Sequence, residues 1–306
     1  MFDFYKHLEQ STRIAVAGDW HLNQMYVKKV LNQIERHKVQ VVLHVGDFGY
    51  YPAYEDYAPY IRHINARAEL NDYVVIFIDG NHEQYDSTPI EQPCDSVIMT
   101  REGLTSLKAK ADENGFVQIA PRIFWATRGA NAHIGTANGA RGVSFLGLGG
   151  AGSVDREYQQ LHGFWSQNEH VTDQDIASAY AGAQKLNGSV DIMLTHDAPT
   201  GAFIPTTYGK TQMDGVPSGV MTETFTTRDR IAKAVALVKP TCLFHGHWHR
   251  FNRSVQVDID GYVVPQVIGL ADETGTNNLR YTDTTLWDCS DSDLMKKLHS
   301  NTLWFW

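Results

Sequence analysis

The chain has 306 residues, enough for one large domain or two ordinary ones, and its apolar and charged fractions are those of a globular protein. With 26 basic and 35 acidic side chains, its formal charge of −9 provides no general basic face for a long nucleic acid, although a local basic cleft remains compatible with it. No run of about 18 apolar residues is present, and the first residues lack the pattern of a secretory signal. We therefore expect a soluble protein that neither spans a membrane nor carries a recognisable export signal.

The three cysteines, Cys94, Cys242 and Cys289, are widely scattered and odd in number. This arrangement matches neither a disulfide framework nor the paired spacing of a zinc knuckle. It is typical of proteins in a reducing compartment, so we expect a cytoplasmic location.

The first third of the chain alternates short β-branched runs with segments of helical periodicity. Strands are expected at residues 13–17, 39–45 and 73–78, and helices at 23–37 and 57–70. Strand–helix–strand alternation is typical of βαβ units, in which parallel strands form one sheet. The sequence therefore predicts an α/β fold.

The rest of the chain contains shorter elements and more glycine. Residues 135–142 (GTANGARG) form either a simple turn or a phosphate-binding loop, and residues 200–226 have little periodicity, which predicts a long loop. Thr172 is a candidate N-cap. The other expected elements are helices at 101–110, 173–185 and 228–238, and strands at 122–127, 132–134, 143–148, 190–194, 241–245, 254–259 and 262–268.

The sequence shows no internal repeat and no linker, so we expect a single domain over residues 1–280, followed by a tail at 281–306. The tail ends in Trp304, Phe305 and Trp306. Because large apolar side chains are rarely left in water, we expect the tail either to fold back on its own domain or to contact a partner, including a second copy of the chain.

Five short motifs follow five of the expected strands. They are AGDWH (residues 17–21), GDF (46–48), GNHE (80–83), THD (195–197) and GHWH (246–249). Because ligands of open α/β sheets bind outside the carboxyl ends of the strands, the Asp, Asn and His side chains of these motifs are expected to converge. Oxygen and imidazole donors without cysteine suit Mn, Fe, Zn or Mg.

This ordered set resembles the motifs of the calcineurin-like metallophosphoesterases, over a span from Arg13 to Gly269. The stretches GLGGAGSVDREY (147–158) and FWSQNE (164–169) also look like bacterial and phage members of that superfamily. The resemblance implies a four-layer αββα sandwich in which two mixed β-sheets are flanked by helices. It also implies an enzyme with a dinuclear metal site at one edge of the sheets.

The resemblance further implies which residues bind the two divalent ions. Asp19, His21 and His249 would bind the first ion, and Asp47 would bridge both through its carboxylate. The second ion would be bound by Asn81, His196 and His247. Mn²⁺ is the preferred identity, with Fe, Zn, Ni or Mg as alternatives, because one ligand set accepts several metals.

The catalytic residues implied by the resemblance are Asp47 and His82. A water coordinated by the two ions becomes a strong nucleophile near neutral pH. In the family, the position of His82 contacts the scissile phosphate and protonates the leaving group, a contribution of roughly 10²–10⁴-fold.

Several neighbouring residues have two interpretations each. Glu83 is expected to orient its loop, and Asp79 or Asp197 to orient a ligand imidazole, unless these carboxylates only cap strand ends. Trp20 and Trp248 either line the cleft or stack a base, or they fill the core. His44 and His245 are expected in the core. Further candidates for substrate contact are Tyr50, Tyr51, Arg156 and Tyr208.

One departure from the family bears on the substrate. Protein Ser/Thr phosphatases continue the second motif as GDxVDRG, whereas this chain continues as GDFGYYP and lacks the phosphate-gripping Arg. We therefore expect a phosphodiesterase that hydrolyses small cyclic or linear nucleotides by a metal-activated hydroxide. The alternatives are a phosphomonoesterase, a metal-dependent nuclease, and a non-catalytic scaffold of the same fold.

Overall fold

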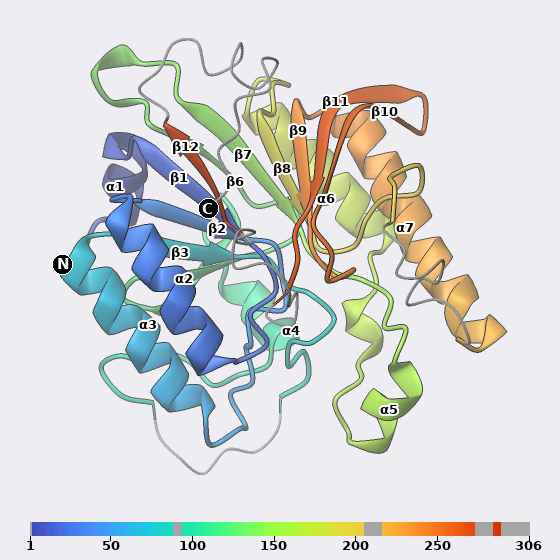
Figure 1. The fold of residues 1–306 in the computed structure, drawn as a ribbon, viewed down its shortest axis with the longest axis horizontal. Helices are drawn as coiled ribbons and strands as arrows, with labels where there is room; N and C mark the ends of the chain where they lie inside the picture. The colour runs from blue at the N-terminus through green and yellow to red at the C-terminus, as the bar shows by residue number, and fades with distance from the viewer. Residues whose placement is uncertain (1, 88–93, 205–215, 273–283, 289–306) are drawn as a thin grey trace.

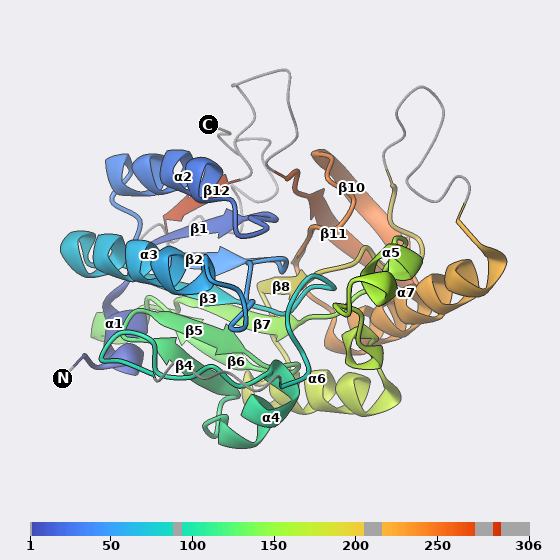
Figure 2. The same ribbon diagram turned by 90° about the horizontal axis from the view of Figure 1, so that it is seen from below.

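The computed structural model describes residues 2–87, 94–204, 216–272 and 284–288. Two six-stranded sheets stack face to face. Helices α2 (Gln24–Arg36) and α3 (Tyr57–Asn71) cover the outer face of the first sheet, and α6 (Asp173–Lys185) and α7 (Ser218–Val238) cover that of the second (Figures 1 and 2). This confirms the four-layer αββα sandwich.

Each sheet has a parallel centre and antiparallel edges, which makes both sheets mixed. The first has the order β12-β1-β2-β3-β5-β4 and the second β10-β11-β9-β8-β7-β6, with only the outermost pairings antiparallel. The strands are β1 (Arg13–Ala17), β2 (Val41–His44), β3 (Val74–Phe77), β4 (Phe116–Ala120), β5 (Ile123–Ala126), β6 (Asn131–Ile134), β7 (Val143–Leu148), β8 (Ile192–Thr195), β9 (Cys242–His245), β10 (Asn252–Ile259), β11 (Tyr262–Gly269) and β12 (Thr284–Asp288).

Shorter helices lie between these main elements. They are α1 (Phe4–Gln10), α4 (Leu104–Leu107) and α5 (Arg156–Leu161), with single 3₁₀ turns η1 (Lys108–Lys110), η2 (Ala137–Gly139) and η3 (Gln167–Glu169). The segment expected to be helical at 101–110 is thus α4 followed by η1. The sequence interpretation did not include α1, β4 or α5.

The central strands are buried on both faces. In β1, Ala15 and Ala17 pack toward the helices, whereas Ile14 and Val16 pack between the sheets. Successive side chains of a strand point to opposite faces, so one short apolar run supplies two hydrophobic layers. This explains why these strands are continuous apolar runs rather than alternating ones, and it leaves polar side chains to the loops at the strand ends.

The loop predicted at residues 200–226 is wrong over its last part, because α7 already begins at Ser218. This first part of the helix is rich in threonine and contains Gly219, which have low helix propensity. Val220, Thr224 and Thr227 are nevertheless buried on one face of the helix. Tertiary packing therefore overrides local propensity here.

Part of the C-terminal tail is described. Strand β12 pairs antiparallel with β1 at the edge of the first sheet. Trp304, Phe305 and Trp306 lie outside the described residues, so the division at residue 280 and the contacts of these three side chains stay predictions. Among the described segments, no helix is long and apolar enough to cross a membrane.

Candidate dinuclear metal centre

The polar motifs meet where strands of both sheets end. Asp19, Asp47 and Asn81 follow β1, β2 and β3 of the first sheet, while His196 and His247 follow β8 and β9 of the second. The loops also contact one another through the backbone. The carbonyl of Asp47 accepts hydrogen bonds from the amides of residues 20 and 21, at 2.9 and 2.8 Å, and Gly246 N–H donates to the carbonyl of His196 at 3.0 Å. The centre therefore spans the seam between the sheets.

The first group of candidate donors is Asp19, His21, Asp47 and His249, whose donor atoms all lie within 4.8 Å of one another. The Nε2 atoms of His21 and His249 are 3.2 Å apart, and His249 Nε2 lies 3.6 Å from Asp19 Oδ2. Two imidazoles and two carboxylates converging on one point form a mixed nitrogen and oxygen set that suits a divalent ion.

The second group shares Asp47 with the first and adds His196 and His247, again with donor atoms within 4.8 Å. Asn81 completes it, because its Oδ1 lies 3.1 Å from His196 Nε2. Asp47 Oδ2 is 3.2 Å from the same nitrogen. One carboxylate common to two donor groups is the arrangement that a two-metal site requires. The structure thus brings all seven sequence-predicted donors together.

Hydrogen bonds on the far side of two imidazoles indicate which nitrogen faces the centre. His196 Nδ1 lies 2.8 Å from the carbonyl oxygen of Val45, and His249 Nδ1 lies 3.0 Å from Asp272 Oδ2. Since each Nδ1 donates to an oxygen, each Nε2 is left to face the other candidate donors. Asp272 was not singled out from the sequence, because no motif contains it.

The donor atoms require positive charge between them. Within the described part of the chain, Asp19 Oδ1 and His247 Nε2 are buried without a hydrogen-bond partner. Burial opposes protonation of His196, but Asp47 and Asp19 outweigh it and raise its pKa to about 10. In the absence of a cation, a proton is thus held where a metal would bind. The donor set suits a dinuclear divalent metal site.

Glycines give the loops the close approach that this site needs. A Cβ at residue 80 would lie 2.1 Å from Asp47 Oδ1, and one at residue 246 would lie 2.1 Å from Asp19 Oδ1. Asp47, His247 and His249 also adopt left-handed backbone conformations, with φ of 53°, 68° and 54°. Strain of this kind persists only where the surroundings hold it in place, and it is common at functional sites.

Glu83 ties two of the loops together, in agreement with its expected orienting role. Its buried carboxylate accepts hydrogen bonds from the backbone amides of Asp47, Gly49 and Gly80. Burial and the nearby charge of Asp47 raise its pKa to about 8.

The expected role of Asp79 and Asp197 in orienting an imidazole is wrong. Asp79 accepts hydrogen bonds from Trp125, Arg128 and Tyr85, and Asp197 accepts one from Trp248 Nε1 at 2.9 Å. Asp272 is the carboxylate that faces a ligand-candidate ring.

His82 lies beside the donors rather than among them. Its backbone N–H donates to Asp47 Oδ1 at 2.9 Å, and its ring centroid is 5.4 Å from that of His21. The imidazole is partly exposed, and its Nε2 lies 3.8 Å from Asp155 Oδ2. This position leaves His82 accessible from solvent next to the centre.

Several other candidates turn out to be structural. Trp20 and Trp248 are almost fully buried, so they fill the core and do not stack a base. His44 and His245 are also buried, as expected. Tyr50 is buried and donates its hydroxyl to the carbonyl of residue 102. Tyr208 lies outside the described residues.

The turn at residues 135–142 joins β6 to the start of β7 and lies at the end of the sheet away from the centre. The turn interpretation is therefore correct, and the phosphate-loop interpretation is wrong.

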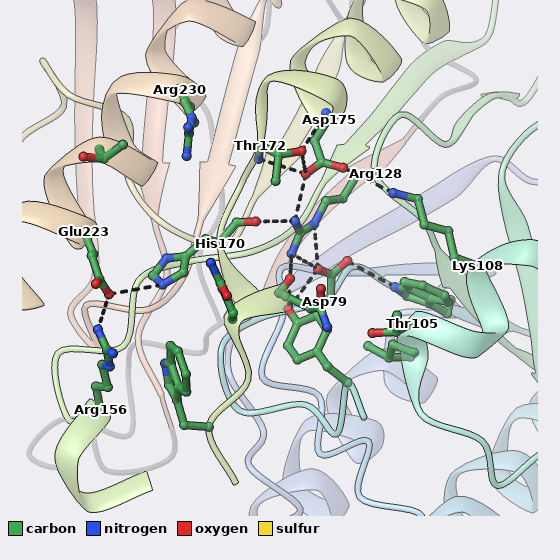
Figure 3. A pocket seen from close by; sticks show the side chains of 17 residues that line it. Asp79, Thr105, Lys108, Arg128, Arg156, His170, Thr172, Asp175, Glu223 and Arg230 are labelled. Carbon is green, nitrogen blue, oxygen red and sulfur yellow. Dashed lines mark hydrogen bonds and ion pairs between the residues drawn. The ribbon is translucent and has the colours of Figure 1, made fainter. Parts of the chain in front are cut away.

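A cavity of about 720 Å³ lies beside the centre and includes none of the seven donors (Figure 3). Arg128 is buried in its wall, between Asp79 and Asp175, at 2.8 and 2.9 Å. Arg156 pairs with Glu223 and also lies over the ring of Trp165, 4.3 Å from its centroid. These charged side chains pair with one another across the walls of the cavity. We therefore interpret the lining as a structural network of ion pairs that supports the loops around the centre.

Comparison with known proteins identifies the family of this chain. The family model described as calcineurin-like phosphoesterase matches residues 12–251. Comparison with curated proteins finds no significant match. Similar solved structures include the protein TT1561 of Thermus thermophilus (11% identity, 96% of this chain and 97% of that chain, TM-score 0.47), a dimetal phosphatase from Danio rerio (13%, 92% and 94%, 0.48) and the calcineurin-like phosphoesterase YfkN from Bacillus subtilis (14%, 96% and 98%, 0.40). Since the family model covers well over half of its length, this chain belongs to the calcineurin-like phosphoesterase family.

Proposed function

We propose that this protein is a dinuclear-metal phosphodiesterase that hydrolyses small nucleotide phosphodiesters. The observation that carries the proposal is the pair of donor groups sharing the carboxylate of Asp47. When bound, two divalent ions would activate water and offset the charge of the phosphate. The donor set of oxygen and imidazole without thiolate favours Mn²⁺, with Fe, Zn, Ni or Mg as alternatives.

The proposed division of the donors follows the two groups. Asp19, His21 and His249 would hold the first ion, and Asp47 would bridge to the second. Three further side chains would complete the second site: Asn81, His196 and His247. Neutral imidazoles and one amide limit the negative charge, so that the loaded centre stays attractive to a phosphate.

His82 is the proposed general acid. It is next to the donors and partly exposed, so its imidazole can reach the leaving-group oxygen of a phosphate bound at the centre. The carboxylate of Asp155 lies 3.8 Å from its Nε2 atom. A proton supplied to the departing alkoxide is worth most for a diester of an alcohol, which is a poor leaving group.

A row of aromatic side chains beside the centre supports a small nucleotide as the substrate. The ring of Tyr54 lies 5.4 Å from that of Tyr51 and 5.6 Å from that of Phe164, between centroids. Tyr54 and Phe164 are each 40% exposed, which leaves surface for a base to stack on. The sequence singled out Tyr51, and the exposed Tyr54 and Phe164 are better placed to contact substrate.

Acidic residues around this row argue against a long nucleic acid. Glu55 and Asp56 directly follow Tyr54 in sequence, and the whole chain carries a charge of −9. Repulsion by these negative charges would disfavour the phosphodiester backbone of a nucleic acid lying over the row, but not an uncharged base or aryl group. The cytoplasmic location is part of the same proposal, and it rests on the scattered cysteines.

The test is turnover by chelated protein with Mn²⁺ added back, using bis-p-nitrophenyl phosphate, p-nitrophenyl phosphate and a panel of cyclic nucleotides. We expect metal-restored hydrolysis with diesters ahead of the monoester. The variant Asp47→Asn should lose turnover because the binding of both ions is weakened. The matched control is Asp173→Asn, which removes an exposed carboxylate. Monoester preference would make the protein a phosphatase. Steeply salt-dependent DNA cleavage would make it a nuclease, and two bound ions without any turnover would indicate a scaffold.

A further inference from the structure

The two sequence stretches without an assigned role, 147–158 and 164–169, meet directly behind the second donor group. Asn81 Nδ2 donates a hydrogen bond to Ser153 Oγ at 3.1 Å, on the side of the amide opposite to His196. Ser153 Oγ in turn lies 2.8 Å from Glu169 Oε2. Asn81 and Ser153 are each 2% exposed and Glu169 is fully buried, so bulk water does not compete for these contacts.

The polarity of this chain of hydrogen bonds is fixed at Glu169. Its Oε1 accepts from the backbone N–H of Ser153 at 2.8 Å and from Trp165 Nε1 at 3.1 Å, which leaves Oε2 for the serine hydroxyl. An ionised carboxylate can only accept, so the hydroxyl of Ser153 must donate its single hydrogen to the ionised Glu169.

A second amide uses the remaining capacity of the serine. Gln159 Nε2 donates to Ser153 Oγ at 3.0 Å, and it is oriented by Asp155 Oδ1, to which it also donates, at 2.8 Å. Because the hydroxyl hydrogen of Ser153 is already donated to Glu169, the serine oxygen can only accept hydrogen bonds from its two amide neighbours. Asn81 must therefore turn its nitrogen toward Ser153 and its oxygen toward His196.

We propose that Ser153 and Glu169 are positioning residues for the second metal ion, and that they act by holding the Asn81 amide with its oxygen toward that ion. The inference rests on the role proposed for Asn81 within the dinuclear centre. Without this support, both orientations of the amide fit the same space, and one of them points an NH₂ group at the cation. Outer hydrogen-bond partners of this kind tune metal affinity without touching the metal.

The isosteric change Glu169→Gln tests the polarity argument. Because the Oε1 position accepts two hydrogen bonds, the new amide must place its oxygen there and its NH₂ toward Ser153. The serine hydroxyl must then donate its hydrogen bond to Asn81. The Asn81 amide has to turn its oxygen toward Ser153 and its NH₂ group toward the ion. We expect the affinity for the second ion to fall by roughly 10–100-fold while that for the first is unchanged. The variant Ser153→Ala should show a similar selective loss.

A compensating change separates positioning from general damage. The variant Asn81→Asp presents oxygens on both sides, so in the Glu169→Gln background its carboxylate can accept from Ser153 and still face the ion. We expect Glu169→Gln/Asn81→Asp to recover much of the lost affinity. The matched control is Glu157→Gln, which makes the same chemical change at an exposed position.

The measurement is calorimetric titration of Mn²⁺ into chelated protein at about pH 8, with thermal unfolding of each variant alongside. Burial raises the pKa of Glu169 to about 8 in the absence of a cation, and a divalent ion nearby favours its ionised form. Unchanged affinity in Glu169→Gln, equal weakening of both ions with a lowered Tm, or only one ion bound by the wild type would each overturn the inference. Two bound ions with no phosphoester turnover would refute the proposed function while leaving this inference standing.

Discussion

Substitution of Asp272 gives the sharpest test of the first donor group. Its Oδ2 lies 3.0 Å from His249 Nδ1, and the residue is 3% exposed, so the contact is shielded from water. A carboxylate in this position fixes the imidazole tautomer and raises its basicity, and removing such a partner typically weakens metal binding by about 10–100-fold. That range corresponds to about 1.4–2.8 kcal/mol. Asp272→Asn keeps an acceptor and should lie near the lower limit, whereas Asp272→Ala should lie near the upper one.

The assay is calorimetric titration of Mn²⁺ into chelated protein, in which the two ions are followed separately. Only binding of the ion held with His249 should weaken, because the contact of Asp272 is with His249, which belongs to the first donor group. Asp173→Asn controls for the loss of one negative charge, since that side chain is 83% exposed. Wild-type affinity in both Asp272 variants, or equal weakening of the two ions, would refute the reasoning.

Three further predictions concern stability and substrate. Burial would raise the pKa of Asp175, but Arg128 and local hydrogen bonds lower it to about 2 from 3.8. The Asp175–Arg128 ion pair therefore contributes about 2 kcal/mol to the free energy of unfolding above about pH 4, and this contribution is lost as the pH falls through about 2. In urea unfolding, the stability difference between wild type and Asp175→Asn should accordingly shrink by about 1 kcal/mol between about pH 5 and pH 3, and a constant difference would contradict this. Gly246→Ala should destabilise by about 1–3 kcal/mol in the same assay, because its Cβ would lie 2.1 Å from a carboxylate oxygen, and wild-type stability would be the contrary result. Phe164→Ala should raise KM for aryl and nucleotide diesters with kcat retained, while Tyr180→Ala, an exposed aromatic on α6, should not; equal effects would remove the aromatic row from the substrate site.

Much of the fold could be predicted because its signals are local. The strand at 13–17 is β1 residue for residue, since a short β-branched run ending at Gly18 has few other interpretations. Helix α6 begins where Thr172 and Asp175 form a capping box, which is also encoded within one turn. The motifs that contain the candidate donors were found for the same reason, because each follows an expected strand, and the resemblance to the family assigned the donors within them.

The residues that support the donors could not be found this way. Asp272 reaches His249, and Glu169 reaches Asn81 through Ser153, from loops distant in sequence, so no short pattern marks them. The sequence also offered Asp79 or Asp197 as a carboxylate that orients an imidazole, with the capping of a strand end as the alternative. In the folded chain the carboxylate of Asp79 faces the other way and binds Arg128. Sequence adjacency places a side chain on a loop but does not say which side of the loop it occupies.

The placement of the donors at the seam connects the fold to the chemistry. Asp19 and Asp47 are both fully buried, and burial together with their mutual repulsion raises the pKa of Asp19 well above its usual range. Two such carboxylates in one core oppose folding unless positive charge accompanies them. Because one sheet supplies both carboxylates and the other supplies His196 and His247, the charge that balances them also joins the two sheets. We therefore expect a divalent ion bound by these residues to stabilise the packing of the two sheets as well as to complete the centre.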